Sequence, residues 1–219
     1  MAYPTISAPY GLKPINLIGG QVFAGATRQL TIASAYGTSI FYGDVVTIVS
    51  GGTIQKDTGT TTATPCGVFL GCSYVNAQGQ VIFQQYYPAS TTAPTGTVIT
   101  AYVADDPDQL FKVVNVAGTT ADDTTSGLLP AYLGRTMIGS NAQLVQNAGS
   151  TASGDSKVAI YSAAGATTTA TLPIRIVDVV PDTANASGNF CEFIVKWNAP
   201  NVTGQTVAGG HQYLNPTGV

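Results

Sequence analysis

The chain contains few side chains that could carry acid–base or nucleophilic chemistry. Its single histidine, His211, lies in the stretch Gly209-Gly210-His211 near the C-terminus, and no G-x-S-x-G sequence occurs. A serine or cysteine nucleophile requires a well-positioned base, which a histidine in a turn-rich tail does not provide. The eleven acidic residues could supply the carboxylate pair of a glycosidase, but nothing in their spacing selects one. We therefore interpret His211 as an exposed tail residue and expect no enzymatic activity.

Three cysteines are the next candidates for chemistry, and their odd number argues against a disulfide framework. Cys66 and Cys72 lie six residues apart in CGVFLGCSY, which in one strand separates their Cα atoms by roughly 20 Å, too far for a disulfide. With Cys191 and His211 they could form a zinc site, but the short C-x₂₋₄-C pair is missing. We expect buried thiols. Strand alternation predicts that one face of this run carries Cys66, Val68, Leu70, Cys72 and Tyr74.

Three carboxylates, Asp105, Asp106 and Asp108, cluster around Pro107. Hard cations such as calcium prefer oxygen ligands of this kind. The D-x-[DN]-x-[DN]-G pattern of calcium loops is absent, however, and Asp-Pro sequences commonly begin turns. The sequence therefore predicts a turn here, with a divalent-cation site as the alternative, and we expect neither a metal nor another cofactor.

Residues 149–156 read GSTASGDS and come close to a phosphate-binding P-loop. The glycine spacing and Ser156 fit that loop, but Asp155 stands where it has its lysine. Because a carboxylate repels phosphate, we interpret the segment as a flexible loop.

The composition is unusual for a free monomer. Only 9% of the residues are charged, whereas soluble domains average about 25%. A monomer normally relies on a charged surface for solubility, so this chain is typical of a subunit packed in a large assembly. The net charge of −3 offers no basic field for nucleic acid. We see neither an apolar stretch long enough to span a membrane nor a signal peptide, and we expect no membrane or direct nucleic-acid partner.

Short apolar runs separated by turn signals extend over much of the chain. From Arg28 onward they recur about every 8–12 residues, which is typical of a β-sandwich or barrel, and Gly51-Gly52 predicts a hairpin. The sequence predicts an all-β fold, a barrel or sandwich of short antiparallel strands, with an extended N-terminal arm and one long excursion. The expected boundaries are 1–20 for the arm, 21–200 for the β-domain, about 104–139 for the excursion, and 201–219 for a turn-rich tail. In FCEFIVKW, the inward face is predicted to carry Cys191, Phe193, Val195 and Trp197.

The arm and the excursion are the segments that we expect to make intermolecular contacts. Pro4, Pro9 and Pro14 keep the arm extended, and its apolar side chains need burial either in the arm's own domain or in a neighbouring subunit. Long excursions are commonly functional. The candidate interaction residues are Tyr3, Ile6, Tyr10, Leu12, Ile15, Leu17 and Ile18 in the arm, and Asp105, Asp106, Asp108, Leu128, Leu129 and Tyr132 in the excursion.

One stretch, YGLKPINLIGGQVFAGATRQLTIASAYGTSIFYGDVVTIVSGGTI from Tyr10 to Ile54, resembles structural proteins encoded in the head-gene clusters of tailed bacteriophages. TPCGVFLGCSY, DDPDQLF, SKVAIY, LPIRIVDVV and FIVKWN continue the resemblance. The order GDVV, GGTI, GVFLG is similar to the β-barrel of small capsid decoration proteins. The resemblance covers most of the chain in patches and rests on strand and turn patterns.

This resemblance implies a capsid decoration, or cement, protein made in the cytoplasm of a bacterial host. Such proteins bind the outer surface of an icosahedral head and clamp neighbouring major coat subunits, often as trimers. The implied partners are the major capsid protein and the chain itself, as a homotrimer, and no cofactor is implied. Two alternatives stay open: a β-barrel component of the phage tail or neck, and a surface module that binds carbohydrate or the host cell.

Overall fold

Short β-strands account for most of the regular structure in this computed structural model. It describes residues 6–116, 118, 135–161, 169–183, 190–199, 201–203 and 206–215. These residues form two six-stranded sheets, a two-stranded hairpin, and 3₁₀ turns at Pro181–Thr183 (η1) and Gln212–Leu214 (η2). The prediction of an all-β fold is confirmed. None of the helical turns in the described ranges is long and apolar enough to cross a membrane.

The first sheet closes on itself. Its strand order is β3-β4-β2-β7-β5-β6, and an additional pairing of β3 with β5 joins five of the strands into a ring, which we call the first barrel. Strand β6 lies outside this ring, next to β5 alone. The hairpin predicted at Gly51-Gly52 connects β3 to β4, and Gly52 takes a positive φ of 73°. The strands are β2 (Arg28–Ile32), β3 (Val45–Ile48), β4 (Ile54–Lys56), β5 (Gly67–Val75), β6 (Val81–Gln84) and β7 (Ile99–Ala104).

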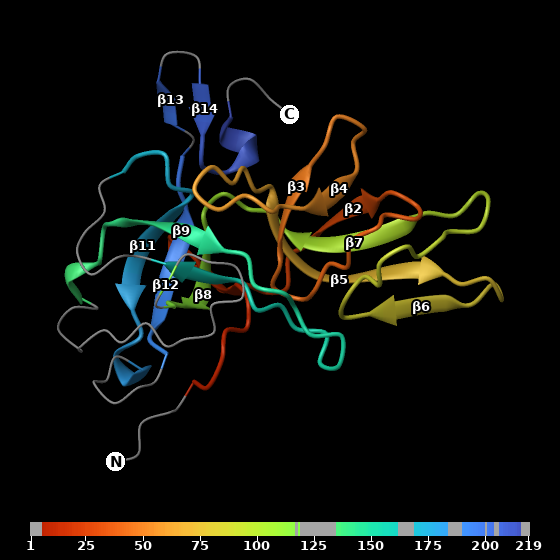
Figure 1. Ribbon diagram of the computed structural model, residues 1–219, viewed down its shortest axis with the longest axis horizontal. Coiled ribbons are helices and arrows are strands. Elements are labelled where there is room, and N and C mark those ends of the chain that lie inside the picture. Colours follow the sequence, from red (N-terminus) through yellow and green to blue (C-terminus); the bar gives the residue numbers. More distant parts are fainter. Residues whose placement is uncertain are drawn as a thin grey trace.

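The second sheet also closes, and we call it the second barrel. Its order is β1-β8-β12-β11-β9-β10, and a bridge between Asn115 and Ile160 brings β10 back to the end of β8. Figure 1 shows the two sheets in neighbouring lobes, with the β13–β14 hairpin beside them. The strands are β1 (Lys13–Leu17), β8 (Gln109–Val114), β9 (Asn141–Val145), β10 (Ala159–Tyr161), β11 (Ile174–Val179), β12 (Glu192–Trp197), β13 (Asn201–Thr203) and β14 (Thr206–Ala208).

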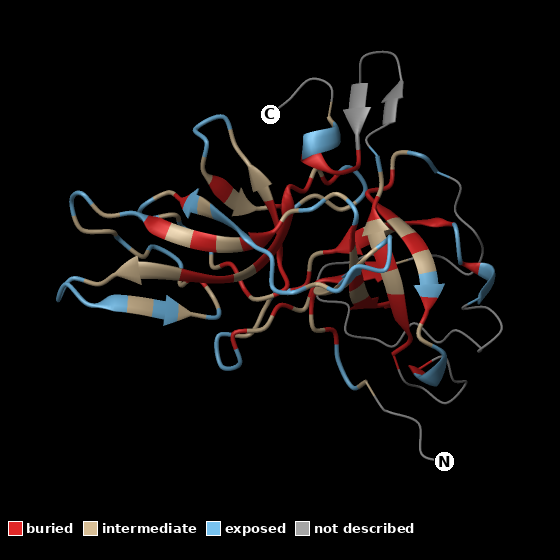
Figure 2. Cartoon of the chain, turned by 180° about the vertical axis from the view of Figure 1, so that it is seen from behind, coloured by how far each residue is buried: buried red, intermediate tan, exposed pale blue. Residues whose placement is uncertain are grey.

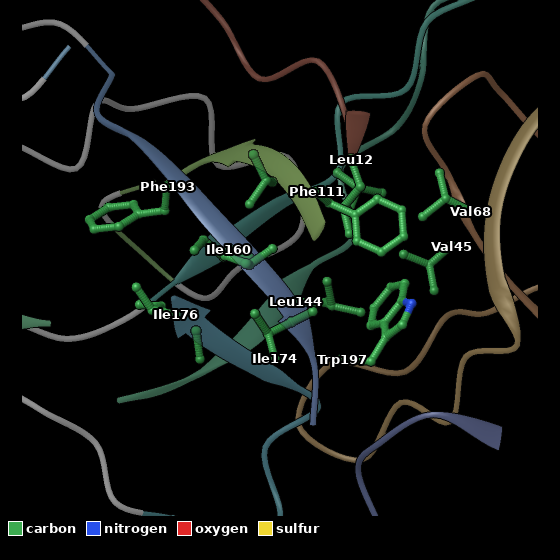
Figure 3. Packing of buried hydrophobic residues seen from close by; sticks show 14 of the residues in the cluster. Leu12, Val45, Val68, Phe111, Leu144, Ile160, Ile174, Ile176, Phe193 and Trp197 are labelled. Atoms are coloured by element: carbon green, nitrogen blue, oxygen red, sulfur yellow. The ribbon is translucent and has the colours of Figure 1, made fainter. Parts of the chain in front are cut away.

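The largest cluster of buried apolar side chains belongs to both barrels, and we call it the shared core. Phe111 and Trp197 pack with ring centroids 5.1 Å apart, and Val45 and Val68 of the first barrel contribute to the same cluster. Figure 3 shows these four side chains beside Leu12. Each side chain buried in this way contributes about 1.5–3 kcal/mol to stability. A separate cluster, which includes Phe69 and Tyr87, fills the first barrel.

The predicted face assignment of β5 is wrong because the strand contains a bulge. The register to β7 shifts between Phe69 and Gly71, and Gly71 adopts a φ of 143°. A bulge inserts one residue and reverses the alternation beyond it. Phe69, Cys72 and Tyr74 therefore face the core of the first barrel, whereas Val68 and Leu70 face the shared core. Cys66 precedes the strand, and its side chain also lies in the core of the first barrel.

Part of the predicted excursion, residues 109–114, is instead a strand of the second barrel. Residues 109–114 form β8, which lies between β1 and β12, with Phe111 and Val113 fully buried. The alternation of QLFKVV directly after the Asp-Pro turn was the overlooked signal. Residues 119–134 of the predicted excursion lie outside the described residues. The predicted inward face of β12 is confirmed, because Cys191, Phe193, Val195 and Trp197 all belong to the shared core.

Candidate functional site

The described part of the N-terminal arm is bound to its own chain. Leu12 is fully buried in the shared core, and its N–H donates to the carbonyl of Gly43 (3.0 Å). Ile6 and Tyr10 pack against a small cluster on the second barrel that includes Phe190. Ile15 and Leu17 are half-buried in β1, Ile18 is 50% exposed, and Tyr3 lies outside the described residues.

A buried polar network fastens the arm to the second barrel. The hydroxyl of Tyr10 donates to Oε1 of Glu192 (2.5 Å), and Nζ of Lys112 lies 3.1 Å from the same oxygen. Burial, together with the hydrogen bond to Glu192, raises the pKa of Tyr10. Glu192 is only 3% exposed, and a buried carboxylate is stable only with such partners. The network therefore keeps Tyr10 on its own barrel.

The Asp-Pro turn is confirmed. Oδ1 of Asp106 accepts the N–H of Asp108 (2.8 Å), and the N–H of Gln109 donates to the carbonyl of Asp106 (3.1 Å). The neighbouring Asp105 faces inward, where its Oδ2 lies 2.6 Å from Nε of Arg28. Within the described ranges, no three His, Cys, Asp or Glu side chains gather closely enough to hold a metal ion.

A pocket of about 520 Å³, which we call the rim pocket, lies beside this turn. The backbone N–H of Ile18 donates to the carbonyl of Asp108 (3.1 Å), so the end of β1 and the turn form neighbouring walls. Val22, which lines the pocket, leaves 77% of its surface exposed, and Ile18 beside the pocket leaves 50% exposed. The pocket thus combines an apolar wall with carboxylates at its edge, and ligand pockets have volumes in this range. Its lining is Leu17, Gln21–Ala24, Ala26–Arg28, Ala104–Asp106 and Gln109.

The rim pocket brings together residues from both predicted contact segments. Leu17 comes from the arm, and Asp105 and Asp106 come from the start of the predicted excursion. Arg28 and Val22 were not predicted. A signal for Arg28 existed, because it is one of only eight basic residues in the chain. Leu128, Leu129 and Tyr132 lie outside the described residues.

His211 is fully buried, so the interpretation of an exposed tail histidine is wrong. It caps η2, with Nδ1 accepting the N–H of Tyr213 (3.2 Å), and its ring lies 6.4 Å from that of Trp197. Burial lowers the pKa of His211 to about 4. The glycines before it, which suggested flexibility, instead allow the chain to pass close to its neighbours: a Cβ on Gly209 would collide with the carbonyl of Thr171.

The segment that follows His211 ties the first barrel to the rim pocket. The side chain of Gln212 accepts the N–H of Ile48 and donates to its carbonyl, both at 2.8 Å, as a neighbouring strand would. The hydroxyl of Tyr213 donates to Oδ2 of Asp105 (2.8 Å), and the guanidinium of Arg28 lies over its ring at 5.2 Å. Asp105 is therefore held by two partners from distant parts of the chain.

The thiols are free and buried, as expected. Burial raises the pKa of Cys66 and of Cys72 to about 12 and that of Cys191 to about 11. Because the thiolate is the reactive form, these cysteines are unreactive at neutral pH in the folded chain.

The P-loop-like segment has a structural role instead. Oγ of Ser156 donates to Oδ1 of the fully buried Asp44 (2.6 Å), which also lies 3.0 Å from Nζ of Lys56. Asp155 accepts a hydrogen bond from Nε2 of Gln85 (2.8 Å). The segment therefore connects the second barrel to the first.

Comparison of the chain with protein-family models, curated proteins and solved structures finds no match.

Proposed function

We propose that this chain is a structural virion protein that binds the outer surface of an icosahedral phage head and stabilises the major coat lattice. The observation that carries the proposal is a surface with little charge and uncovered apolar side chains. Soluble monomers usually keep such side chains isolated among charged residues. Among the described residues, eight large apolar or aromatic side chains have more than a third of their surface exposed: Ile18, Val22, Val81, Phe83, Val98, Ile138, Tyr213 and Leu214.

Half of the chain's basic side chains are paired within it. In the described part of the chain, four of the eight basic side chains form ion pairs with acidic ones, and two of these pairs involve the buried carboxylates Asp44 and Glu192. Contacts between subunits avoid the cost of removing charge from water when their centres carry few charged residues. A weakly charged surface supports a role in a lattice of subunits.

Within this proposal, the rim pocket is the contact point for the major capsid protein. Its apolar wall would take an apolar or long aliphatic side chain, and the exposed carboxylate of Asp106 would attract a basic group beside it. The second proposed partner is the chain itself, as a homotrimer that forms when the coat lattice brings three copies together. The proposed location is the outside of the head after synthesis in the bacterial cytoplasm, and no cofactor takes part.

A binding experiment tests the pocket. Expanded heads that lack this protein are mixed with the wild-type chain, with Val22→Lys or with Val98→Lys, and binding is measured by sedimentation. Val98 is 61% exposed and precedes β7, at the opposite end of that strand from Ala104. We expect Val22→Lys to weaken binding at least tenfold, because it places a charge on an apolar contact, and Val98→Lys to bind like the wild type. Equal binding by all three chains would contradict the pocket assignment.

The copy number in purified virions, measured by quantitative mass spectrometry, tests the role itself. A decoration protein repeats with the coat lattice, so we expect hundreds of copies per particle. About a dozen or fewer would favour a tail or neck component, because those assemblies are single rings. Absence from the virion would overturn the proposal.

A further inference from the structure

Strand β6 is an unprotected sheet edge. Among the strands of the described ranges it pairs with β5 alone, and it projects from the first barrel (Figure 1). Val81 and Phe83, on its outer face, are 61% and 73% exposed, and Figure 2 shows this strand among the exposed parts of the lobe. Proteins normally protect such an edge with a charge, a proline or a bulge. The strand itself, VIFQ, has a regular register to β5 and contains no charged residue or proline.

The unpaired backbone groups of β6 belong to Val81 and Phe83. The N–H of Asn76 donates to the carbonyl of Gln80 (2.9 Å), and the register continues without a shift to the end of the strand. Hydrogen-bonded pairs alternate along an antiparallel ladder. Ile82 therefore bonds to β5, whereas Val81 and Phe83 direct their N–H and C=O groups away from the sheet.

This edge is held rigid by its turn. Oδ1 of Asn76 accepts the N–H groups of Gln78 (3.0 Å) and Gln80 (2.9 Å), and its Nδ2 donates to Oε1 of Gln80 (3.0 Å). The hydroxyl of Tyr74 donates to Oε1 of Gln84 across the strand pair (3.1 Å). A strand that is already fixed loses little conformational freedom when it pairs.

We propose that β6 pairs antiparallel with β6 of a second copy of this chain, with Val81 opposite Phe83 of the other copy. In this register the outward N–H and C=O groups of Val81 and Phe83 form hydrogen bonds on both copies. The outer face of the joined sheet then carries two apolar Val81–Phe83 pairs, one on each side of the twofold axis. No charged residue occurs between Asp57 and Asp105, so the β5–β6 hairpin itself presents no like charges to a second copy. The inference rests on the geometry of the edge and does not depend on the proposed capsid role.

The association is tested by sedimentation equilibrium over a wide concentration range. The wild-type mass rises from 22.4 kDa toward twice that value as concentration increases. Val81→Pro removes an outward N–H, and proline is tolerated at the first residue of an edge strand, so we expect self-association to weaken at least tenfold. The matched control Val81→Thr keeps the N–H and associates within about threefold of the wild type. A wild-type chain that stays monomeric, or equal association of all three chains, overturns the proposal.

Cysteine crosslinking tests the register independently. At the twofold axis Ile82 faces itself in a non-hydrogen-bonded pair, for which the Cα atoms lie about 4.5 Å apart, within the range of a disulfide. We expect Ile82→Cys to form a covalent dimer under mild oxidation. Val81→Cys is the control. This position is more exposed than position 82, but its Cα lies about 7–8 Å from the Cα of residue 81 in the other copy. Equal or faster crosslinking of Val81→Cys would indicate random collision and overturn the pairing.

Discussion

At the scale of single residues, the environment of His211 makes stability depend on pH. In the unfolded chain this histidine takes up a proton as the pH falls through about 6.5, whereas in the folded chain burial lowers its pKa to about 4. The unfolded state then binds more protons between these values, so the free energy of unfolding decreases as the pH falls from about 6.5 to 4. Above about pH 7.5 both states are neutral and the contribution vanishes.

We expect His211→Asn to remove this part of the pH dependence. Asparagine is a favoured helix cap and keeps an acceptor for the N–H of Tyr213. Urea unfolding is measured for both chains from pH 8 to pH 4. Relative to the variant, the wild type loses about 3 kcal/mol over this range, and the carboxylates common to both chains cancel in the difference. A difference that stays constant with pH would contradict the burial of the neutral imidazole.

Two aspartates with similar partners are expected to differ greatly in their contribution to stability. Asp44 is fully buried and is paired with Lys56, whereas the side chain of Asp108 is 66% exposed and pairs with Lys196. Asp44→Asn leaves a nearly buried ammonium without a counter-charge, so we expect the free energy of unfolding to fall by about 3–5 kcal/mol. Asp108→Asn, the matched control, changes it by about 1 kcal/mol or less. Chemical denaturation of the two variants measures both values, and similar losses would contradict the structure.

At the scale of elements, the bulge in β5 directs side chains to their cores. A Cβ at Gly71 would lie 3.0 Å from the carbonyl oxygen of Gln84, and the φ of this residue is one that side chains rarely adopt. We expect Gly71→Ala to lower the free energy of unfolding by about 1–3 kcal/mol. It should also increase the reaction of Cys72 with thiol reagents, because loss of the bulge turns this side chain away from the core. Gly51→Ala, where a Cβ meets nothing within 4 Å, is the control and is nearly neutral.

The strands themselves were largely predictable, and the exceptions have physical causes. Alternation identified the inward face of β12, and a glycine pair identified the β3–β4 hairpin. Alternation could not reveal the bulge in β5, because an inserted residue leaves no change in composition. Leu12 and the strand that follows it were predicted only as an extended arm, since prolines restrict the backbone but do not reveal which neighbour supplies the hydrogen bonds.

The candidate site was predictable in part. The acidic turn and the arm were both singled out as contact segments, and the rim pocket joins them through Leu17, Asp105 and Asp106. Tyr213 and His211 were missed because glycines and polar residues around them are typical of loose tails. Their burial depends on contacts with Asp105 and Trp197, which are distant in sequence and leave no local pattern.

At the scale of the whole molecule, the shared core predicts that the two barrels unfold together. Side chains of β3 and β5 pack with those of β8 and β12, and Gln212 adds hydrogen bonds to β3. We expect the fluorescence of Trp197, the single tryptophan, and far-ultraviolet circular dichroism to give coincident unfolding curves. A transition in circular dichroism that precedes the loss of the Trp197 signal would show that the first barrel opens alone.

The positions of the three thiols make them natural probes of how often different parts of the core open. Cys66 and Cys72 lie in the core of the first barrel, and Cys191 lies in the shared core. A buried thiol reacts with an alkylating reagent only during the moments when its surroundings open. The rates at which the three sites are alkylated in the native protein therefore report separately on openings of the first barrel's core and of the shared core. Mass spectrometry can read these rates from the natural chain, with no probe added to disturb the packing that it reports on.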